Sequence, residues 1–374
     1  MTPLDIETRT MFAATVGRVF STSDAGANVD GIWAELAEGG VLALGIPEWA
    51  DGVGGGMADL GMVMRSIGAA LSPAPYLSTV VISAWLVASL EGRRGKEGLS
   101  AFAAGKRRIS LAHYEPDAGY SGSASRTAVA ERGSGPVLNG RKHFVLDAEH
   151  ADAFLVTARD AAGLTRVCLV DRHAPGLEVS VEQAVDGTRI GRLTLRGATA
   201  KILGDGDAAG RVEEALERAN VAVCAEALGA MEEITEKTRE YLRTRRAFGR
   251  TLSQFQVLQH RFVDMLIALE ETRAVVEAAE AACDHKDADR ATAVHACKIT
   301  TGRTSRFVSA QGIQLHGGVG VTDELIISRY YKRLMMLEAS FGNSAHHLRV
   351  FAGICQQRYG DDATDGSAVR IQRS

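Results

Sequence analysis

The chain has 374 residues, of which 46% are hydrophobic and 24% are charged, and its formal net charge is −4 at pH 7. This length exceeds what one hydrophobic core usually fills, so we expect two or three domains. The acidic balance argues against a nucleic-acid-binding protein, which needs an excess of positive charge. Five widely spaced cysteines without a Cys-x-x-Cys pair indicate reduced thiols in a cytoplasmic protein, with neither a disulfide framework nor a zinc site.

Two segments bear on export and membranes. The N-terminal stretch MTPLDIETRTMF contains acids and lacks an apolar centre, so we expect no secretory signal. The longest apolar run, residues 76–90, is shorter than the roughly 20 residues of a membrane-spanning helix, and it carries three serines and a threonine. We therefore predict a buried helix there and no membrane span.

Residues 1–108 are predicted to form an N-terminal helical domain. Helical spacing of apolar residues recurs in segments 32–45, 57–71 and 76–90, which glycines and prolines separate. The glycine-rich stretch DGVGGG, residues 51–56, resembles a phosphate-binding loop only superficially, because no Lys-Ser/Thr follows it and no strand precedes it. It is predicted to be a plain loop.

Residues 109–208 change to a two-residue period and are predicted to form a compact antiparallel β domain. The expected strands lie in RRISLAHYE, PVLNGRKHFVL, DAFLVTAR, TRVCLVDR, LEVSVEQ and GRLTLRGATAKIL. Within the second of these, the dipeptide Asn139-Gly140 suits a type I′ turn and predicts a β-hairpin.

Residues 209–358 return to helical spacing, which predicts a C-terminal four-helix bundle. The expected helices are 209–246, 252–283, 287–316 and 323–358. The charged tail of small residues, 359–374, is expected to be disordered. The predicted fold class is therefore α+β, in the order helical, β, helical.

One acid stands out in the first helix of the bundle. Glu217 shares a helical stripe with Val221, Cys224 and Leu228 in the stretch ALERANVAVCAEALGAM. An acid there is either an ordinary residue at a helix edge, favoured in a first turn by the helix dipole, or a desolvated general base. The stripe alone leaves both interpretations open.

Two further motifs are typical of anion binding. Arginines cluster in RTRRAFGR, and glutamines follow in LSQFQVLQH; the residues are Arg243, Arg245, Arg246, Arg250, Gln256, Gln259 and His260. Such arginines bind phosphates in a bidentate manner, although a solvated basic face has the same composition. In QGIQLHGGVGVTDE, Gly317 and Gly318 would let backbone amides approach an anion, or would simply end a helix.

Four segments in order carry a family resemblance. AHYEP, LNGRKHFVLDAEHADAFLVTAR, RRAFGRTLSQFQVLQHRFVDM and QLHGGVGVTDELIISRYYKRL are similar to the acyl-CoA dehydrogenase family of flavoproteins, over about residues 30–355. The resemblance implies the same three domains, with FAD bound where they meet and partly by a neighbouring subunit. It also implies removal of two hydrogens from an acyl-CoA thioester to give a trans-2-enoyl-CoA.

The resemblance assigns cofactor contacts to thirteen positions: Leu111, His113, Tyr114, Phe144, Leu146, Arg245, Phe248, Phe255, Gln256, Gln314, Gly317, Gly318 and Asn343. Two of them depart from the family pattern. Relatives often have Trp and Thr where this chain has Phe144 and Leu146, so a side-chain hydrogen bond to the flavin is missing. A backbone amide could replace it.

The catalytic base also departs from the common pattern. Many relatives carry it in a Glu-Gly pair, where this chain has Phe341 before Gly342. Others place it on the first bundle helix in a Leu-Glu-Arg setting, which here is Glu217. The resemblance therefore implies Glu217 as the base, with Glu338 as a fallback.

Substrate contacts are implied for Tyr120, Glu214 and Arg218, with a surface ion pair as the alternative for the last two. His316, His346 and His347 lack ligand spacing, so no metal is expected. Expected partners are an acyl-CoA, an electron-transfer flavoprotein or similar acceptor, and other subunits in a homomeric or heteromeric assembly.

Three functions remain open at this point. The first is an active dehydrogenase that uses Glu217. The second is a partner subunit of a heteromeric dehydrogenase, because CAEALGAM and YYKRL resemble small subunits of bacterial enzymes for steroid-derived or dicarboxylic CoA thioesters. The third is an acyl-CoA oxidase. Small residues around Glu217 would permit a branched or ring-bearing acyl group, which is our hypothesis for the substrate, although helix packing explains these residues equally well.

Overall fold

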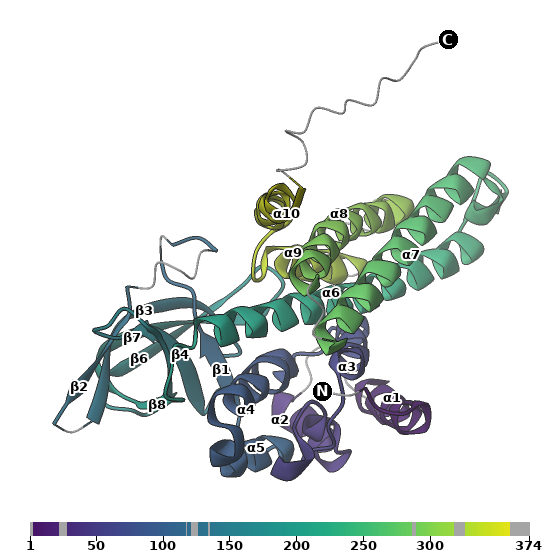
Figure 1. Cartoon of the computed structure of the whole chain (residues 1–374). Coiled ribbons are helices and arrows are strands. Elements are labelled where there is room, and N and C mark those ends of the chain that lie inside the picture. Colours follow the sequence, from purple (N-terminus) through teal and green to yellow (C-terminus); the bar gives the residue numbers. More distant parts are fainter. Residues whose placement is uncertain are drawn as a thin grey trace.

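The computed structural model describes residues 3–21, 28–116, 118–120, 126–133, 135–285, 289–317 and 326–359. Helices lie before Ile109 and after Ala208, and strands lie between them (Figure 1). The N-terminal elements are α1 (Ile6–Ser21), α2 (Val29–Glu38), η1 (Val41–Ala43), η2 (Glu48–Ala50), α3 (Met57–Ala70), η3 (Leu77–Ala84), α4 (Trp85–Glu91), η4 (Gly92–Gly95) and α5 (Lys96–Ala103). These match the predicted helical character of the segment.

The apolar run 76–90 is helical and mostly buried, as predicted, but its first half is a π-helix, η3. A π-helix widens the backbone turn and is frequently found at functional sites. No helix among the described residues is long and apolar enough to cross a membrane. The stretch 51–56 is a loop, as predicted, and Gly56 forms the N-cap of α3.

The middle of the chain forms one sheet with the order β6-β7-β3-β2-β4-β5-β8, and β1 pairs with β4. The strands are β1 (Ile109–Ala112), β2 (Ala128–Arg132), β3 (Gly135–Leu146), β4 (Ala153–Arg159), β5 (Thr165–Asp171), β6 (Leu177–Gln183), β7 (Arg189–Thr199) and β8 (Lys201–Leu203). Most pairs are antiparallel, but β4 pairs in parallel with both β1 and β2. The sheet is therefore mixed rather than purely antiparallel.

The predicted hairpin at Asn139-Gly140 is wrong, because both residues lie inside the continuous strand β3. The register of β3 against β7 shifts between Leu138 and Asn139, and the Asn139 side chain accepts a hydrogen bond from the Gly197 amide at 2.8 Å. A Cβ on Gly140 would lie 2.4 Å from Thr127 Oγ1. The glycine therefore serves a close approach at a β-bulge instead of a turn.

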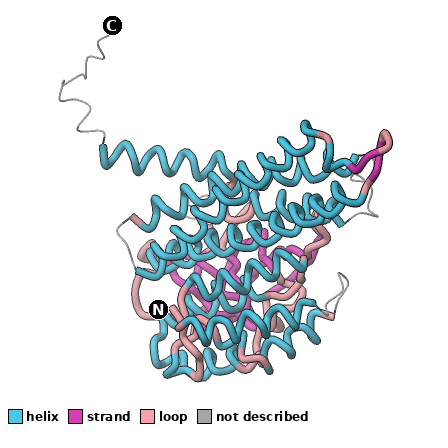
Figure 2. The backbone as a smooth tube through the Cα atoms, turned by 90° about the vertical axis from the view of Figure 1, so that its right-hand side faces the viewer, coloured by secondary structure: helices cyan, strands magenta, loops and turns pink. Residues whose placement is uncertain are grey.

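The C-terminal part contains α6 (Ala209–Thr244), α7 (Gln256–His285), α8 (Arg290–His316), α9 (Ile326–Ala339) and α10 (Ser344–Tyr359), with the short elements β9 (Arg246–Ala247), β10 (Arg250–Thr251) and η6 (Leu252–Gln254). Figure 2 shows these helices in front of the sheet. The predicted single helix 323–358 is wrong, because Phe341 and Gly342 interrupt it with φ angles of 58° and 118°.

The long helix α6 connects the parts of the molecule. It packs against α3, η3 and α4 of the N-terminal part and against α7, α8 and α9 of the bundle. The stripe predicted from Glu217 is buried throughout, since Val221, Cys224 and Leu228 are at most 1% exposed. All five cysteines carry free thiols. The predicted tail, apart from Tyr359, lies outside the described residues.

Candidate flavin and substrate site

A narrow cavity lies where the end of β1, β3, η3, α6 and the break between α9 and α10 converge. Its lining residues are Ser78, Ile82, Ser110, Leu111, His113, Tyr114, Phe144, Leu146, Leu216 and Phe341. Five of the predicted cofactor positions thus line one cavity, although they come from two separate segments: Leu111, His113, Tyr114, Phe144 and Leu146. The free volume is about 10 Å³, which is room for about one water molecule.

The Phe144 ring reaches the cavity because of an irregularity in β3. Phe144 has a φ of 54°, in the left-handed region that residues other than glycine rarely adopt. The pairing of β3 with β7 shifts register between Lys142 and Val145, directly around it. Strained backbone of this kind persists where the surrounding structure fixes it, and it is concentrated at functional sites.

The segment that begins at Leu111 is held by a buried ionic network. Lys142 donates to Glu115 Oε1 at 2.8 Å and to the His113 carbonyl at 3.0 Å. Thr127 also donates to Glu115 Oε1, at 2.7 Å. Burial raises the pKa of Glu115, but these hydrogen bonds outweigh it and hold the pKa at about 2. The network fixes the backbone beside the cavity, with Tyr114 7% exposed.

The break after α9 is closed by two side chains, Lys298 and Glu338, of which Lys298 was not assigned from the sequence. Lys298 donates to the carbonyls of Leu337, Glu338 and Ser340 at 2.8 to 3.3 Å. Glu338, the fallback base, accepts hydrogen bonds from the Ser344 amide and hydroxyl, so its carboxylate caps α10. These contacts hold Phe341 at the cavity, 6.4 Å from Tyr114 between ring centroids.

Asn343 also caps α10, because its side-chain oxygen accepts a hydrogen bond from the His346 amide at 2.9 Å. Tyr120 lies near this helix, with its ring 5.3 Å from His346 and 6.4 Å from Tyr114. Both predicted contacts therefore lie beside residues that line the cavity, near the start of α10.

Glu217 lies on the neighbouring face of α6. The adjacent Leu216 lines the cavity, and a helix turns by about 100° per residue, so the Glu217 carboxylate points elsewhere. It ion-pairs with Arg290 Nε at 2.6 Å, at the start of α8. Burial raises the pKa of Glu217, and the Arg290 guanidinium opposes that shift. Glu217 is 9% exposed.

Glu214 and Arg218, the predicted substrate contacts on either side of Glu217, have different surroundings. Glu214 ion-pairs with Arg290 at 3.5 Å and with Arg211 at 3.3 Å. Arg218 is 4% exposed and stacks on Trp85 with its guanidinium carbon 5.4 Å from the ring centroid. Its Nε and Nη2 find no hydrogen-bond partner among the described residues. An unpaired buried guanidinium leaves donors available for an anionic group.

The remaining predicted cofactor residues form a second group at the far end of the bundle. Arg245 ends α6, Gln256 begins α7, and Gly317 ends α8 with a φ of 67°. The Tyr241 hydroxyl donates to the His316 carbonyl at 3.3 Å, which ties the ends of α6 and α8 together. The other members of this group are Phe248, Phe255 and Gln314, whereas Gly318 lies outside the described residues.

Several residues of this second group are exposed to solvent. Phe248 is 94% exposed and has a φ of 53°. Arg245 and Gln256 are exposed, and Arg245 forms no ion pair with any described residue. Gln259 instead donates to the Ser253 carbonyl at 2.8 Å, and Arg250 stacks on Phe255 at 3.9 Å. An exposed aromatic beside unpaired arginines is typical of a surface that another molecule covers.

The two groups cannot serve the same ligand within one chain. Leu216 and Arg245 lie near opposite ends of α6, roughly 44 Å apart at the helical rise of about 1.5 Å per residue (Figure 1). This is farther than one dinucleotide can reach. Among the described residues, no group of three His, Cys, Asp or Glu side chains is placed to hold a metal.

Comparisons with known proteins identify the family. Residues 110–197 match the acyl-CoA dehydrogenase middle domain, and residues 209–353 match the acyl-CoA dehydrogenase C-terminal domain. Acyl-CoA dehydrogenase IpdE2 of Mycobacterium tuberculosis (strain ATCC 25618 / H37Rv) is 29% identical over 318 residues, covering 84% of this chain and 83% of that protein.

Two solved structures are similar over almost the whole chain. A variant of the Tcur3481-Tcur3483 steroid ACAD has a TM-score of 0.83 and 27% identity, covering 95% of this chain and 99% of that one. The ChsE4-ChsE5 complex from Mycobacterium tuberculosis has a TM-score of 0.82 and 24% identity, covering 98% and 100%. The domain matches, the fold and the converging motifs together show that this chain belongs to the acyl-CoA dehydrogenase family of flavoprotein oxidoreductases.

Proposed function

We propose that this chain takes part in FAD-dependent α,β-dehydrogenation of an acyl-CoA thioester, in an assembly whose flavin sites are built from two chains. The observation that carries this proposal is the separation of the two groups of cofactor residues at opposite ends of α6. The aromatic and apolar side chains around the cavity of one chain would contact the flavin ring, and the Arg245 end of a neighbour would bind the pyrophosphate and adenine side.

The side chains present suit FAD at both ends. The rings of Phe144 and Tyr114 and the side chain of Leu146 offer an apolar wall to a planar isoalloxazine. Arg245 has no ion-pair partner among the described residues, so its guanidinium is free to bind a diphosphate. When bound, FAD supplies the acceptor for the hydride that leaves Cβ of the thioester.

The CoA part of the substrate has a suitable surface beside the first cavity. A second cavity of about 540 Å³ is lined by Pro116, Arg141, Lys142, His143, Ser180, Arg192, Leu193 and Thr194. The exposed guanidinium groups of Arg141 and Arg192 suit phosphate groups. Pro116 lies between Tyr114 and Tyr120, two of the predicted site residues. A branched or ring-bearing acyl group remains our proposal for the other end of the substrate.

Glu217 is the proposed base for the α-proton. Its burial favours the protonated carboxyl and so brings its pKa toward the working range of a general base. To reach the substrate, the carboxylate would have to exchange its ion pair with Arg290 for a position beside Leu216. Apolar side chains around the cavity would exclude water during that transfer.

A second candidate function is a partner subunit that supports another chain's site. The specific observation in its favour is the cavity itself, because none of its described lining residues carries a carboxylate and Phe341 fills the position of the common base. One structure of similar fold is a complex of two different chains, ChsE4 and ChsE5 of Mycobacterium tuberculosis. This chain would then lend its Arg245 end to the flavin of a second, catalytic chain.

The first experiment is the visible spectrum of the purified chain, with flavin measured per subunit before and after addition of an acyl-CoA. About one FAD per chain, bleached by substrate, would support a self-sufficient dehydrogenase. A colourless or half-loaded protein that gains flavin and activity on co-expression with a second family member would support the partner role.

Glu217 is then tested by substitution. Glu217→Gln should abolish turnover while folding and flavin content stay normal, because the amide cannot accept the α-proton. Glu214→Gln is the matched control, since Glu214 is also an Arg290 partner on the same helix face. Full activity in Glu217→Gln would rule out this base. A loss of activity equal in both variants would instead assign the effect to the Arg290 ion pairs that the two acids share or to the substrate contact implied for Glu214.

A further inference from the structure

A third cavity, of about 850 Å³, lies where α1, α3, α6 and α7 meet. It shares no lining residue with the cavity at Phe341. Much of its wall is apolar, and alanines together with Met62 supply it: Ala13, Ala58, Ala69 and Ala281. A volume of this size lies within the range of about 300 to 1,000 Å³ that is typical of small-ligand sites.

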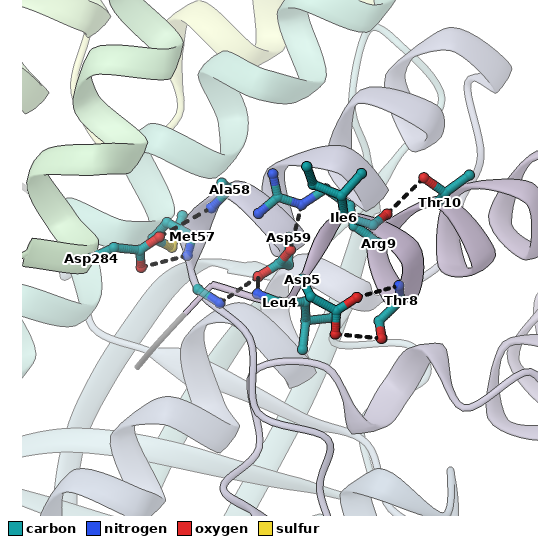
Figure 3. Close-up of polar contacts among 11 residues, drawn as sticks. Leu4, Asp5, Ile6, Thr8, Arg9, Thr10, Met57, Ala58, Asp59 and Asp284 are labelled. Atoms are coloured by element: carbon teal, nitrogen blue, oxygen red, sulfur yellow. Dashed lines mark hydrogen bonds and ion pairs between the residues drawn. The ribbon is translucent and has the colours of Figure 1, made fainter.

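Most charged groups at this cavity already have partners. Figure 3 shows that Asp59 accepts hydrogen bonds from Arg9 Nε at 2.8 Å and from the Leu4 amide at 3.0 Å. Asp284 accepts from the Met57 amide at 2.7 Å and so caps the start of α3 (Figure 3). These carboxylates are therefore satisfied, and Arg9 is already neutralised.

Arg65 on α3 is likewise paired, with Glu232 of α6 at 2.5 Å. Glu232 also accepts from Arg273 Nη2 at 3.0 Å. Neither arginine that lines the cavity is thus left to neutralise another acid. The remaining lining acids, Glu277 and Glu280, give the cavity an excess of negative charge.

Glu280 is the unusual member. It is 7% exposed, and it accepts no hydrogen bond from any described residue. Its carboxylate lies directly against α3, because a Cβ on Gly61 would be 1.8 Å from Glu280 Oε1. A buried carboxylate without a partner is costly, and proteins retain such groups mainly where a ligand or a proton completes them.

We infer that this cavity binds an ammonium or guanidinium group carried on a short apolar chain, with Glu280 as its counter-ion. The cation would supply the missing hydrogen bonds, and the alanine and methionine wall would take the apolar chain. The group could belong to a free amine or to a lysine or arginine of another protein. The chemistry of recognition is the same in both cases.

The protonation of Glu280 gives this site a distinctive signature. Burial raises its pKa to about 8, with Arg65 opposing the rise and Asp284 adding to it. The charged groups that face it from the packed elements are Arg9, Arg65, Glu232, Glu277 and Asp284. At pH 7 the empty site therefore holds a proton that a bound cation expels, so affinity should rise as the pH increases toward 8.

The test uses methionine methyl NMR on the full chain, with Met62 as the reporter and Met62→Leu to assign its signal. The probes are n-butylammonium and n-butanol, which have similar apolar chains and differ in charge. Butylammonium should shift the Met62 signal in a saturable manner, whereas butanol should not. Equal shifts with both probes, or a shift with neither probe in the chain or in its assembly with a second subunit, would overturn the inference.

Substitutions locate the counter-ion. Glu280→Gln should weaken butylammonium binding about tenfold or more, since it removes a buried charged hydrogen-bond acceptor. Glu277→Gln, at an exposed acid on the same helix, should change it far less. Glu280→Gln keeps the shape of the side chain, and its flavin content and circular dichroism should match the parent. Unchanged affinity in Glu280→Gln would remove the site.

Two further readouts test the proton released from Glu280 and the source of the cation. Calorimetry at pH 7 in buffers of different ionisation enthalpy should reveal a proton released on binding in the parent and none in Glu280→Gln. If another protein supplies the cation, co-expression with a second family member should shift Met62 and block the amine. If free amines are the ligand, the assembled protein should still bind butylammonium.

Discussion

The crossing of α3 and α6 depends on two glycines that face each other's backbone. A Cβ on Gly229 would lie 1.9 Å from the Arg65 carbonyl oxygen, and a Cβ on Gly68 would lie 1.9 Å from the Glu226 carbonyl oxygen. Carbon atoms normally keep about 3.5 Å from their neighbours, so Gly229→Ala must push the two helices apart by roughly 1.5 Å. The obstacle is backbone, which cannot rotate away as a side chain could.

The expected magnitude follows from two opposing effects. Alanine in a helix interior is favoured over glycine by about 1 kcal/mol. Overpacking a tight contact costs about 3 kcal/mol at the upper end of its usual range, and a gap of this width forfeits much of the dispersion between the helices. We therefore expect Gly229→Ala to lower the free energy of unfolding by about 2 kcal/mol.

The assay is urea unfolding followed by circular dichroism, with Gly17→Ala as the matched control. Gly17 lies inside α1, and a Cβ there would meet nothing within 4 Å, so this variant should gain up to about 1 kcal/mol. The double variant Gly68→Ala/Gly229→Ala should lose less than the sum of the single losses, because one displacement accommodates both methyl groups. Stabilisation of Gly229→Ala to the same extent as Gly17→Ala would refute the close crossing.

Two further predictions concern buried charge. Glu115→Gln should destabilise the chain by about 3 to 5 kcal/mol, because it strands the buried Lys142 ammonium, and Glu115→Gln/Lys142→Met should recover most of that loss in the same unfolding assay. The pKa values of His347 and His295 are lowered mainly by burial, to about 3 and about 4, from 6.5. Both folded pKa values are depressed, so the contribution of these two histidines to stability should be constant above pH 6.5 and fall as the pH drops toward 4. His347→Asn should flatten that acid slope in urea midpoints measured across this range; an unchanged slope would contradict the assignment.

The regular helices could be predicted because their apolar spacing is local information. The predicted 209–246 and 287–316 correspond to α6 and α8 within a few residues. The break between α9 and α10 could not be predicted in this way. It depends on Phe341 in a left-handed conformation and on Lys298 of the neighbouring helix α8, which donates to the carbonyls at the end of α9 from about 40 residues earlier in the sequence.

The strand predictions show the same limit. Asn139-Gly140 has a strong local preference for a turn, yet the strand continues through it. The reason is non-local. Gly140 lies against Thr127, and the Asn139 side chain accepts a hydrogen bond from the Gly197 amide of the neighbouring strand β7. Packing against neighbours overrides turn propensity when the two conflict.

The family resemblance was enough to name the site residues. It could not predict the direction in which each side chain points. The helical stripe left open whether Glu217 is a helix-edge acid or a desolvated one, and in the structure Glu217 is 9% exposed beside the buried Val221 and Cys224. It could not reveal that Leu216, one position earlier, faces the cavity. Nor could it supply Arg290, the ion-pair partner of Glu217, which lies far along the chain. Direction depends on which element packs against each helix face.

Because α6 is long, binding of the cofactor and catalysis by this chain have to be tested separately. Residues at its Arg245 end act, in our proposal, on the flavin of a neighbour, whereas Leu216 and Phe341 act on the chain's own cavity. The presence of Arg245 in this chain therefore indicates that the neighbouring chain binds a cofactor. It carries no information about turnover in the cavity at Phe341. A heteromeric assembly could keep every arginine of this chain while its catalysis occurs elsewhere, and only variants placed separately at the two ends can distinguish the roles.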